Sequence, residues 1–343
     1  MGVHLMTQVA ILGASGFVGG ELLRLCAMHP HLKPTRLFGD SQAGTPLADV
    51  HPHVAPAYPG LRVERFSAEA LDGVELVFAA LPHGQSQAVA PAILDRGIPF
   101  VDLGADFRLR DAASYEQWYG EAHHAPELLD RFVYGIPELH RDAIRGATAV
   151  AAAGCYPTSA ILALKPLVDA WLIDPDGIIV DASSGVSGAG KGLKDSTHFN
   201  SVSESFSAYG LLSHRHTAEM EASLGASVLF TPHLAPMNRG ILATCYGRAT
   251  RVMDPGEPLA VLRAAYADAP FVHVTEQPPA TKWTLGSNTV QVTARYDERT
   301  GRVLAIAALD NLVKGAAGQM IQCANLMLGL EETAGLPLCG VYP

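Results

Sequence analysis

The sequence predicts a protein of the α/β class, with a doubly wound parallel-sheet domain followed by an α+β domain whose sheet is mainly antiparallel or mixed. Three observations support this prediction. Strands alternate with helices over residues 1–150, whereas in the second half strands follow one another through short turns. At 343 residues the chain is also long enough to bury two hydrophobic cores.

The first half has the pattern of buried strands connected by helices. Strands are expected at residues 8–12, 35–38, 74–81 and 99–103, and helices at 16–28 and 85–96. The run 74–81 is continuously apolar, which is typical of a parallel strand covered on both faces. We therefore expect residues 1–150 to form the doubly wound domain.

The second half is richer in strands. Strands are expected at residues 177–182, 228–231, 241–252, 288–296 and 303–309, helices at 157–171 and 312–328, and a glycine- and serine-rich loop at 183–192. A turn at residues 297–301 joins the last two strands as a hairpin. Residues 151–311 are expected to form the second domain, and the C-terminal segment 312–343 to pack back on the first.

The first strand and the first helix are joined by a glycine-rich turn, Gly13-Ala14-Ser15-Gly16-Phe17-Val18-Gly19. Gly13 and Gly16 let the backbone turn tightly and approach a pyrophosphate, and Gly19 lets the helix pack closely on the strand. The N–H groups at a helix start stabilise phosphate charge. The turn predicts a Rossmann-type dinucleotide-binding domain, with cofactor contacts from Gly13, Ser15, Gly16, Phe17 and Val18.

The end of the second strand bears on which nicotinamide cofactor is bound. Asp40 stands where an acidic residue favours the ribose of NAD. Ser41, Gln42 and Gly44 follow it, and a small polar loop of this kind can hold the 2′-phosphate of NADP. Asp40 also has the plainer interpretation of a solvent-facing turn residue, so these residues leave both cofactors open.

Cys155 precedes the helix that is expected to begin at Pro157, and it is the candidate nucleophile. A thiol attacks as the thiolate, which the dipole of a helix start favours, and the first N–H groups of the helix suit an oxyanion. The alternative is a buried structural cysteine. A nucleophilic thiol beside a bound hydride carrier can interconvert an aldehyde and an activated acyl group.

The other four cysteines indicate no such role. Cys26, Cys245 and Cys323 lie in apolar patterns and are expected to be buried, and Cys339 lies in a tail. No cysteine has the spacing of a metal site, so no metal is expected. Scattered reduced thiols are typical of a cytoplasmic protein.

The segment from Ser213 to Glu219 offers the acid/base that thiol chemistry needs. His216 and Glu219 are three residues apart and share a face if this segment is helical, so Glu219 can orient the imidazole. We favour His216 over His214 as the acid/base. The alternative is an ordinary helix start with surface histidines.

An anionic substrate needs cationic contacts. Arg108 lies just past the end of a buried strand, where the ligands of parallel sheets bind. Arg215, Lys191 and Lys194 are the other candidates. Each of these residues has the alternative interpretation of a solvated surface charge.

Composition argues against several classes of partner. The net charge of −10 disfavours nucleic acid and anionic membranes. No apolar run approaches the ~20 residues that span a bilayer. The first strand begins so early that we expect no signal peptide.

Several motifs spread over nearly the whole chain carry a family resemblance. They are Gly13–Gly20, Leu81–Ser86, Gly104–Leu109, Gly154–Thr158, Ser183–Gly190, His214–His216, Pro236–Gly240 and Asp310–Gly318. In these motifs the chain resembles the N-acetyl-γ-glutamyl-phosphate reductases, which share a structural family with aspartate-semialdehyde dehydrogenases. Ala153 and Ala218 depart from the pattern, because the family commonly has proline at both positions.

The resemblance implies a cytoplasmic, NADP-dependent enzyme of arginine biosynthesis that reduces a small anionic acyl phosphate. It implies Cys155 as the nucleophile and an acid/base in the segment His214–His216. It also implies a homodimer or homotetramer formed through the second domain. Further cofactor contacts implied by the motifs are Leu81, Pro82, Ser184, Gly185, Gly188 and Asn311, the last near the nicotinamide. Asp40 is not the usual neighbour of an NADP site.

Two alternatives have different functions. A related reductase would act on aspartyl phosphate or on a carrier-bound aminoadipyl or glutamyl phosphate, and the acidic net charge argues against the basic entrance that a carrier needs. A non-catalytic nucleotide-binding redox sensor would keep the glycine turn but would need no acid/base segment.

Overall fold

The structure is a computed structural model that describes residues 6–343. The chain divides into two compact units. The first unit runs to Ala153 and includes Ala316–Leu336, and the second consists of Gly154–Gly315 and Pro337–Pro343. The expectation that no signal peptide is present concerns the first five residues, which lie outside the described part of the chain.

The first unit is built on a seven-stranded sheet in the order β3-β2-β1-β4-β5-β7-β6, with every neighbouring pair parallel. Its strands are β1 Thr7–Leu12, β2 Leu32–Phe38, β3 Val63–Glu64, β4 Leu76–Ala79, β5 Phe100–Asp102, β6 Phe132–Gly135 and β7 Ala149–Ala152. Its helices are α1 Phe17–Cys26, α2 Leu47–Val50, α3 Ser86–Leu94, α4 Ala112–Tyr119, α5 Pro137–Arg145 and α10 Gly318–Met327. The order reverses between β1 and β4, where doubly wound sheets bind ligands.

The core of the first unit explains its sequence pattern. Every residue of β4 is buried, in agreement with the continuous apolar run. Helix α10 is buried along its whole length except Met327 and contacts α5, β5 and β7, so no side of it faces solvent. Its polar side chains are hydrogen-bonded, for example Gln322 Nε2 to Glu138 Oε1 at 2.9 Å, as burial requires.

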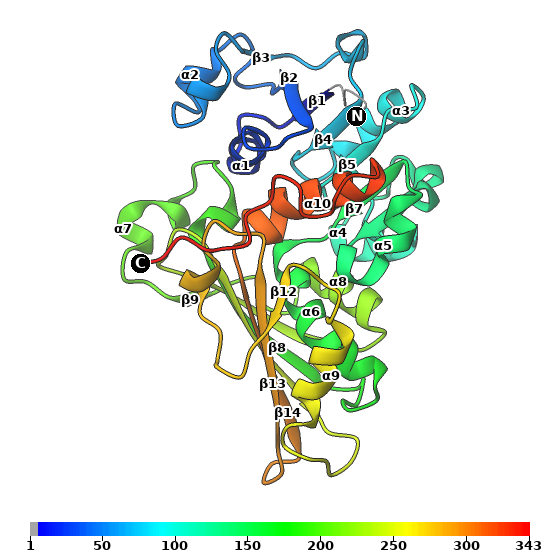
Figure 1. Ribbon diagram of the computed structural model, residues 1–343, viewed down its shortest axis with the longest axis vertical. Helices are drawn as coiled ribbons and strands as arrows, with labels where there is room; N and C mark the ends of the chain where they lie inside the picture. Colours follow the sequence, from blue (N-terminus) through cyan, green and yellow to red (C-terminus); the bar gives the residue numbers. More distant parts are fainter. Residues whose placement is uncertain (1–5) are drawn as a thin grey trace. The chain divides into compact units, whose positions relative to one another are not determined.

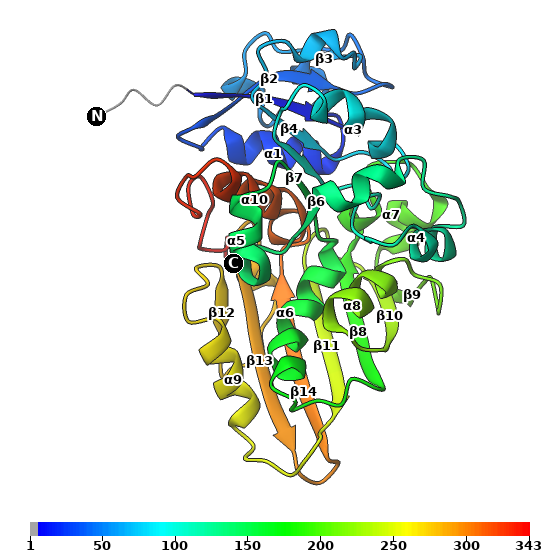
Figure 2. The same cartoon turned by 90° about the vertical axis from the view of Figure 1, so that its right-hand side faces the viewer.

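The second unit has a mixed seven-stranded sheet in the order β12-β13-β14-β11-β8-β10-β9. Its strands are β8 Ile178–Gly185, β9 Ser207–Ala208, β10 Val228–Ala235, β11 Ile241–Arg248, β12 Val272–Val274, β13 Val290–Asp297 and β14 Arg302–Leu309. Its helices are α6 Cys155–Asp169, α7 Phe199–Val202, α8 His216–Leu224 and α9 Glu257–Ala265. Figures 1 and 2 show α6, α8 and α9 on one face of this sheet.

Four of the six strand pairings in the second sheet are antiparallel, and the β10–β8 and β12–β13 pairings are parallel. The last two long strands form the predicted hairpin, with Asp297 opposite Arg302. The parallel sheet of the first unit and the mixed sheet of the second together confirm the predicted fold class.

Three local predictions were wrong in detail. Residues 183–185 continue β8 instead of starting a loop, because their backbone is paired with β10 on one side. Cys155 is the first residue of α6, which begins two residues earlier than expected. The expected helix 312–328 is a π-helix over Val313–Ala317 followed by α10, and its first hydrogen bond runs from Gly315 N to Asp310 O.

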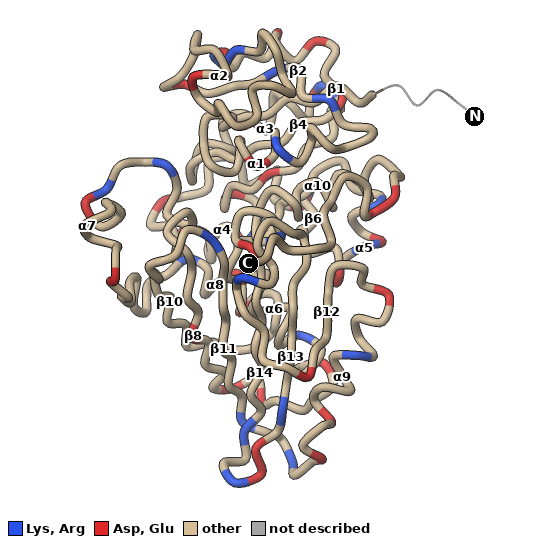
Figure 3. The backbone as a smooth tube through the Cα atoms, turned by 60° about the vertical axis from the view of Figure 1, so that its left-hand side comes forward, with Lys and Arg blue, Asp and Glu red and all other residues tan. Residues whose placement is uncertain are grey.

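Charged residues of both signs occur in both units (Figure 3). Within residues 6–343, no helix combines the length and apolar character needed to cross a membrane.

Candidate active site

The glycine turn of the first unit leaves room for a ligand and none for side chains. Gly13 has a φ of +78°, and a Cβ there would lie 2.3 Å from the carbonyl oxygen of Ala80. A Cβ on Gly19 would lie 2.6 Å from the backbone of Ala14. Gly16 is the N-cap residue of α1, which has neither a side-chain cap nor an acidic residue in its first turn. These features fit the pyrophosphate of a dinucleotide.

The remaining predicted cofactor residues of the first unit lie around this turn. Ser15 and Val18 are half-buried, and Phe17 is 40% exposed. Leu81 and Pro82 follow the end of β4, and a Cβ on Gly13 would come within 3.5 Å of Leu81 N. The turn therefore lies against the end of β4, at the point where the strand order reverses.

The loop after β2 has a basic neighbour that no sequence pattern indicated. Asp40 and Ser41 are exposed, as is the rest of the loop to Gly44. Arg62 comes from a distant segment, and its Nη2 donates a hydrogen bond of 2.6 Å to Gly44 O. The loop therefore carries the carboxylate of Asp40 and contacts the guanidinium group of Arg62.

Arg108 lies on the loop that follows β5, and a buried carboxylate fixes this loop. Arg108 is half-buried, and its Nη2 donates to Leu103 O at 2.6 Å. Asp106 accepts hydrogen bonds from Gly84 N at 2.8 Å and Gln87 N at 3.3 Å. Asp106 thereby ties the arginine loop to the segment that leads into α3. Sequence analysis gave Asp106 no role, and only its position after a buried strand could have indicated one.

A second buried carboxylate, Asp102, ends β5. It accepts hydrogen bonds from Ser86 Oγ at 2.7 Å and Gly104 N at 2.9 Å. Burial raises the pKa of Asp102 to about 7, although these two hydrogen bonds act in the opposite direction. Asp102 therefore titrates near neutral pH, immediately before the loop that carries Asp106 and Arg108.

In the second unit, Cys155 begins α6. Gly154 is the N-cap residue, with φ −66° and ψ 157°, and α6 has neither a side-chain cap nor an acidic residue in its first turn. Cys155 is half-buried, whereas Cys26, Cys245 and Cys323 are buried as predicted and Cys339 is exposed. Burial raises the pKa of the Cys26 thiol to about 12, which makes it a poor nucleophile.

The π-helix packs directly on this cysteine. A Cβ on Gly315 would lie 2.8 Å from the Cβ of Cys155, so residue 315 must be glycine for the cysteine to stay in place. Single turns of π-helix occur frequently at functional sites. No sequence pattern indicated this contact, because residues 155 and 315 come from opposite ends of the second unit.

The predicted histidines lie among aromatic rings at the start of α8. The ring of His216 is 4.8 Å from that of His214 and 5.9 Å from that of Tyr156, which follows Cys155. His214 Nδ1 accepts a hydrogen bond from His216 N at 3.2 Å. Burial lowers the pKa of His214 to about 4, and the nearby charge of Arg215 adds to this effect. His214 is therefore neutral at physiological pH.

Glu219 is buried in the same helix, and its carboxylate reaches α6. Glu219 Oε1 accepts a hydrogen bond of 2.7 Å from Gly154 N. That Glu219 orients the imidazole of His216 stays a prediction, and the sequence contained no signal for a bond to residue 154. This bond attaches the acid/base helix to the residue immediately before the cysteine.

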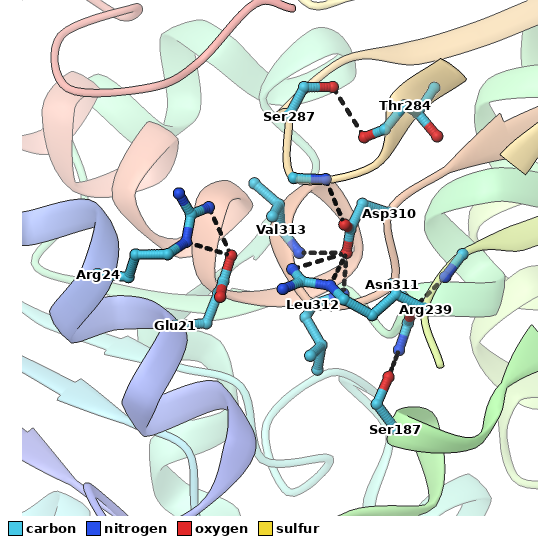
Figure 4. A network of polar contacts seen from close by, with 12 residues as sticks. Glu21, Arg24, Ser187, Arg239, Thr284, Ser287, Asp310, Asn311, Leu312 and Val313 are labelled. Carbon is cyan, nitrogen blue, oxygen red and sulfur yellow. Dashed lines mark hydrogen bonds and ion pairs between the residues drawn. The ribbon is translucent and has the colours of Figure 1, made fainter. Parts of the chain in front are cut away.

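A buried acid, Asp310, organises the segment that precedes the π-helix (Figure 4). Its Oδ1 accepts from Leu312 N at 2.9 Å and from Arg239 Nη2 at 3.0 Å, and its Oδ2 accepts from Gly286 N at 2.7 Å. Sequence analysis missed Asp310, although it begins a motif that was singled out.

Asn311 ties the same segment to the loop after β8 (Figure 4). Its Oδ1 accepts from Gly240 N at 2.7 Å, and its Nδ2 donates to Ser187 Oγ at 3.0 Å. A Cβ on Gly188 would come within 3.7 Å of Asn311 Nδ2 and within 2.7 Å of Ser184 Oγ. Asn311, Ser184, Gly185 and Gly188 therefore lie in one neighbourhood.

The predicted cationic residues fall in different units. Arg108 belongs to the first unit, whereas Arg215 and Lys191 belong to the second and are exposed. Over residues 6–343, the structure contains no cluster of three or more histidine, cysteine or acidic side chains arranged to hold a metal ion.

Comparisons with known families match both halves of the chain. Residues 8–147 match the model of the semialdehyde dehydrogenase NAD binding domain, and residues 155–311 match that of the semialdehyde dehydrogenase dimerisation domain. The matched boundary falls immediately before Cys155.

Similar curated proteins match over almost the full length. An N-acetyl-γ-glutamyl-phosphate reductase of Desulforudis audaxviator is 47% identical, over 98% of this chain and 100% of that protein. One of Symbiobacterium thermophilum is 48% identical, over 98% of this chain and 99% of that protein. One of Geobacillus stearothermophilus is 44% identical, over 98% and 100%.

Similar solved structures share the fold at low identity. Aspartate semialdehyde dehydrogenase II of Vibrio cholerae, complexed with ASA, has a TM-score of 0.70 at 18% identity, covering 94% of this chain and 98% of that one. Aspartate semialdehyde dehydrogenase of Candida albicans, with NADP, has a TM-score of 0.70 at 15% identity, with the same coverage.

Proposed function

Because the chain belongs to the N-acetyl-γ-glutamyl-phosphate reductase family, we propose that it reduces N-acetyl-γ-glutamyl phosphate to N-acetylglutamate 5-semialdehyde and phosphate in cytoplasmic arginine biosynthesis. The observation that carries the proposal is the position of Cys155. It is a half-buried thiol at the start of a helix whose first turn contains no acidic residue.

Cys155 is the proposed nucleophile. Its thiolate attacks the acyl carbon, phosphate leaves with the electron pair of the C–O bond, and a thioester remains. The first N–H groups of a helix have no acceptor within the helix, so those of α6 can stabilise the oxyanion that forms. Pro157 supplies no N–H for this role.

His216 is the proposed acid/base. After reduction of the thioester, the imidazole protonates the oxygen of the thiohemiacetal and takes the proton back as the C–S bond breaks and the aldehyde departs. His214 Nδ1 accepts from His216 N, which makes His214 the residue that fixes the start of α8. The lowered pKa of His214 leaves it neutral and supports the choice of His216 as the acid/base.

The glycine turn of the first unit fits a nicotinamide dinucleotide, which supplies hydride when bound. We propose NADP as the preferred form. Arg62 supports this proposal because its guanidinium group borders the loop from Asp40 to Gly44, and a nearby arginine can accommodate a 2′-phosphate. We expect Arg62→Ala to weaken NADPH binding about tenfold and to leave NADH binding unchanged, as measured by fluorescence titration.

Arg108 is the proposed contact for the anionic substrate, and Arg215 and Lys191 are the further candidates. Arg108→Ala should raise the KM for the acyl phosphate or slow acylation. Unchanged kinetics would place the phosphate site elsewhere. We also propose a homodimer or homotetramer formed by the second unit, since residues 155–311 match a dimerisation domain. Light scattering of the purified protein tests the assembly.

The reverse reaction tests the activity directly. The purified protein should reduce NADP in the presence of N-acetylglutamate semialdehyde and phosphate, and the rate should fall to background when phosphate is omitted. The same assay with NAD tests the cofactor. Aspartate semialdehyde in place of the substrate separates the proposed activity from that of a related reductase.

A further inference from the structure

We propose that Glu219 is a positioning residue that holds the backbone immediately before Cys155, through a hydrogen bond to the N–H of Gly154. The inference rests on the proposed function only in treating Cys155 as the nucleophile. It assigns Glu219 a role through the backbone of α6, beside the expected role of orienting an imidazole.

The geometry of the contact is that of a strong, buried hydrogen bond. Glu219 Oε1 lies 2.7 Å from Gly154 N, and Glu219 is 2% exposed. The two residues are 65 positions apart in the chain, so helix α8 reaches across to the start of α6. A carboxylate acceptor makes such a bond stronger than a neutral one, and losing it would leave a buried donor without a partner.

The carbonyl group of the same residue is also fixed. Gly154 O accepts hydrogen bonds from Thr158 N and Thr158 Oγ1, both at 2.9 Å. Gly154 is thus held on its N–H side by Glu219 and on its carbonyl side by Thr158. The direction of the Cys155 side chain follows from this backbone, and misplacing a reacting atom by about 1 Å can cost about 100-fold in rate.

The chain provides a matched control on the same helix. Glu221 Oε1 accepts a hydrogen bond of 2.9 Å from Val228 N. This is also a hydrogen bond from a backbone N–H to a glutamate of α8. Its donor, however, is Val228, the first residue of β10. Glu221→Ala therefore measures what the loss of such a bond does when it does not hold residue 154.

The kinetic test compares four variants. Glu219→Ala should lower kcat at least about tenfold and leave the KM for NADP within about twofold, because the nucleophile is displaced and the cofactor turn is untouched. Glu219→Gln keeps an oxygen acceptor at the same reach and should retain at least about a third of kcat. Glu219→Asp is one methylene shorter and should behave like alanine, which covers the case that alanine does not fold. Glu221→Ala should stay within about twofold of the wild type.

The direct test measures hydrogen exchange at the Gly154 amide, by mass spectrometry with residue-level fragmentation. Exchange should accelerate at least about tenfold in Glu219→Ala and Glu219→Asp, and should be unchanged in Glu219→Gln and Glu221→Ala. This measurement needs no turnover. If the wild type reduces no acyl phosphate, the proposed function fails and the exchange rates still decide whether the bond exists.

Three results would overturn the inference. One is an unchanged Gly154 exchange rate in both the alanine and aspartate variants, which would mean that Glu219 does not hold this amide. Another is accelerated exchange with kcat equal to that of Glu221→Ala, which would mean that the bond exists but does not position the nucleophile. A glutamine variant as slow as alanine would count against the inference in the same way.

Discussion

The starts of α1 and α6 have the same backbone arrangement but different surroundings. Each follows a strand of the parallel sheet and has a glycine N-cap in extended conformation, with φ −78° and ψ 174° at Gly16 and φ −66° and ψ 157° at Gly154. Neither helix has a side-chain cap or an acidic residue in its first turn. Both therefore present the positive end of a helix dipole.

The two helix starts differ in what surrounds them. The start of α1 is open, with Phe17 40% exposed and Gly16 half-buried. The start of α6 is enclosed, with Tyr156 2% exposed and Gly154 N bonded to Glu219. An open helix start suits the phosphate of a ligand that binds and dissociates. An enclosed helix start suits a thiolate of the chain itself, which must be held in one orientation. The same backbone arrangement thus fits the proposed binding role in one place and the proposed catalytic role in the other.

The largest effect is expected at the enclosed helix start. Cys155→Ser should lower kcat by at least about a thousandfold, because an alcohol is a far poorer nucleophile at neutral pH. The Kd for NADPH should stay within about twofold, since the cofactor turn is in the other unit. Steady-state rates and cofactor titration check both expectations, with Cys339→Ser as the exposed-thiol control. Near-wild-type turnover by Cys155→Ser would contradict the proposed mechanism.

A substitution near the open start of α1 should reduce stability and cofactor affinity. Gly13→Ala forces a Cβ to within 2.3 Å of Ala80 O at a φ of +78°, so the turn must shift. We expect the free energy of unfolding to fall by about 3 kcal/mol and the Kd for NADPH to rise at least about tenfold. Gly146→Ala is the control, because a Cβ there meets nothing within 4 Å. Equal Kd values for the two variants would mean that this turn does not bind the cofactor.

The packing on the enclosed start can be tested without touching the thiol. Gly315→Ala places a Cβ 2.8 Å from that of Cys155, which should displace the cysteine. The expected result is a roughly tenfold loss of kcat with unchanged cofactor affinity, and a cost of about 2 kcal/mol in stability. Gly192→Ala, with open space around the added Cβ, should match the wild type in both measurements. A full kcat in Gly315→Ala would show that this contact does not hold the cysteine.

The smallest effect concerns pH. His214 has a pKa of about 4 in the folded protein and about 6.5 when unfolded, so the unfolded chain binds a proton first as the pH falls. Stability is therefore lost on acidification through 6.5, by about 1 kcal/mol between pH 7 and pH 5.5. His214→Asn keeps an acceptor for His216 N and removes this titration. Urea unfolding at both pH values should show a correspondingly smaller loss, and equal losses would contradict a neutral His214.

Regular patterns in the sequence carried the fold prediction. The apolar run at 74–81 and the hairpin at 297–301 placed β4, β13 and β14 within a few residues of their observed ends. Strand β7 was missed because Ala149-Val150-Ala151-Ala152 has no strand preference of its own, and its pairing with β5 and β6 makes it a strand. Tertiary pairing overrode local propensity there.

The candidate site likewise contains features that could be predicted from the sequence and features that could not. The glycine turn and the thiol at a helix start were visible in the sequence, because each depends on neighbouring residues. The bond from Glu219 to Gly154 and the contact of Gly315 with Cys155 were not visible, since each joins segments far apart in the chain. Arg62 was missed for the same reason, as its neighbour Gly44 lies 18 residues away.

The buried carboxylate of Asp310 has a consequence for how this chain is made. Its side chain accepts hydrogen bonds from Arg239, Gly286 N and Leu312 N. Gly315 N donates a hydrogen bond to the backbone oxygen of Asp310, and Gly315 packs on Cys155. During synthesis Cys155 emerges long before this acid does. A product that ends before residue 310 would therefore contain Cys155 without the segment that packs on it. We expect the Cys155 thiol of such a fragment to be more exposed to oxidants than in the folded chain.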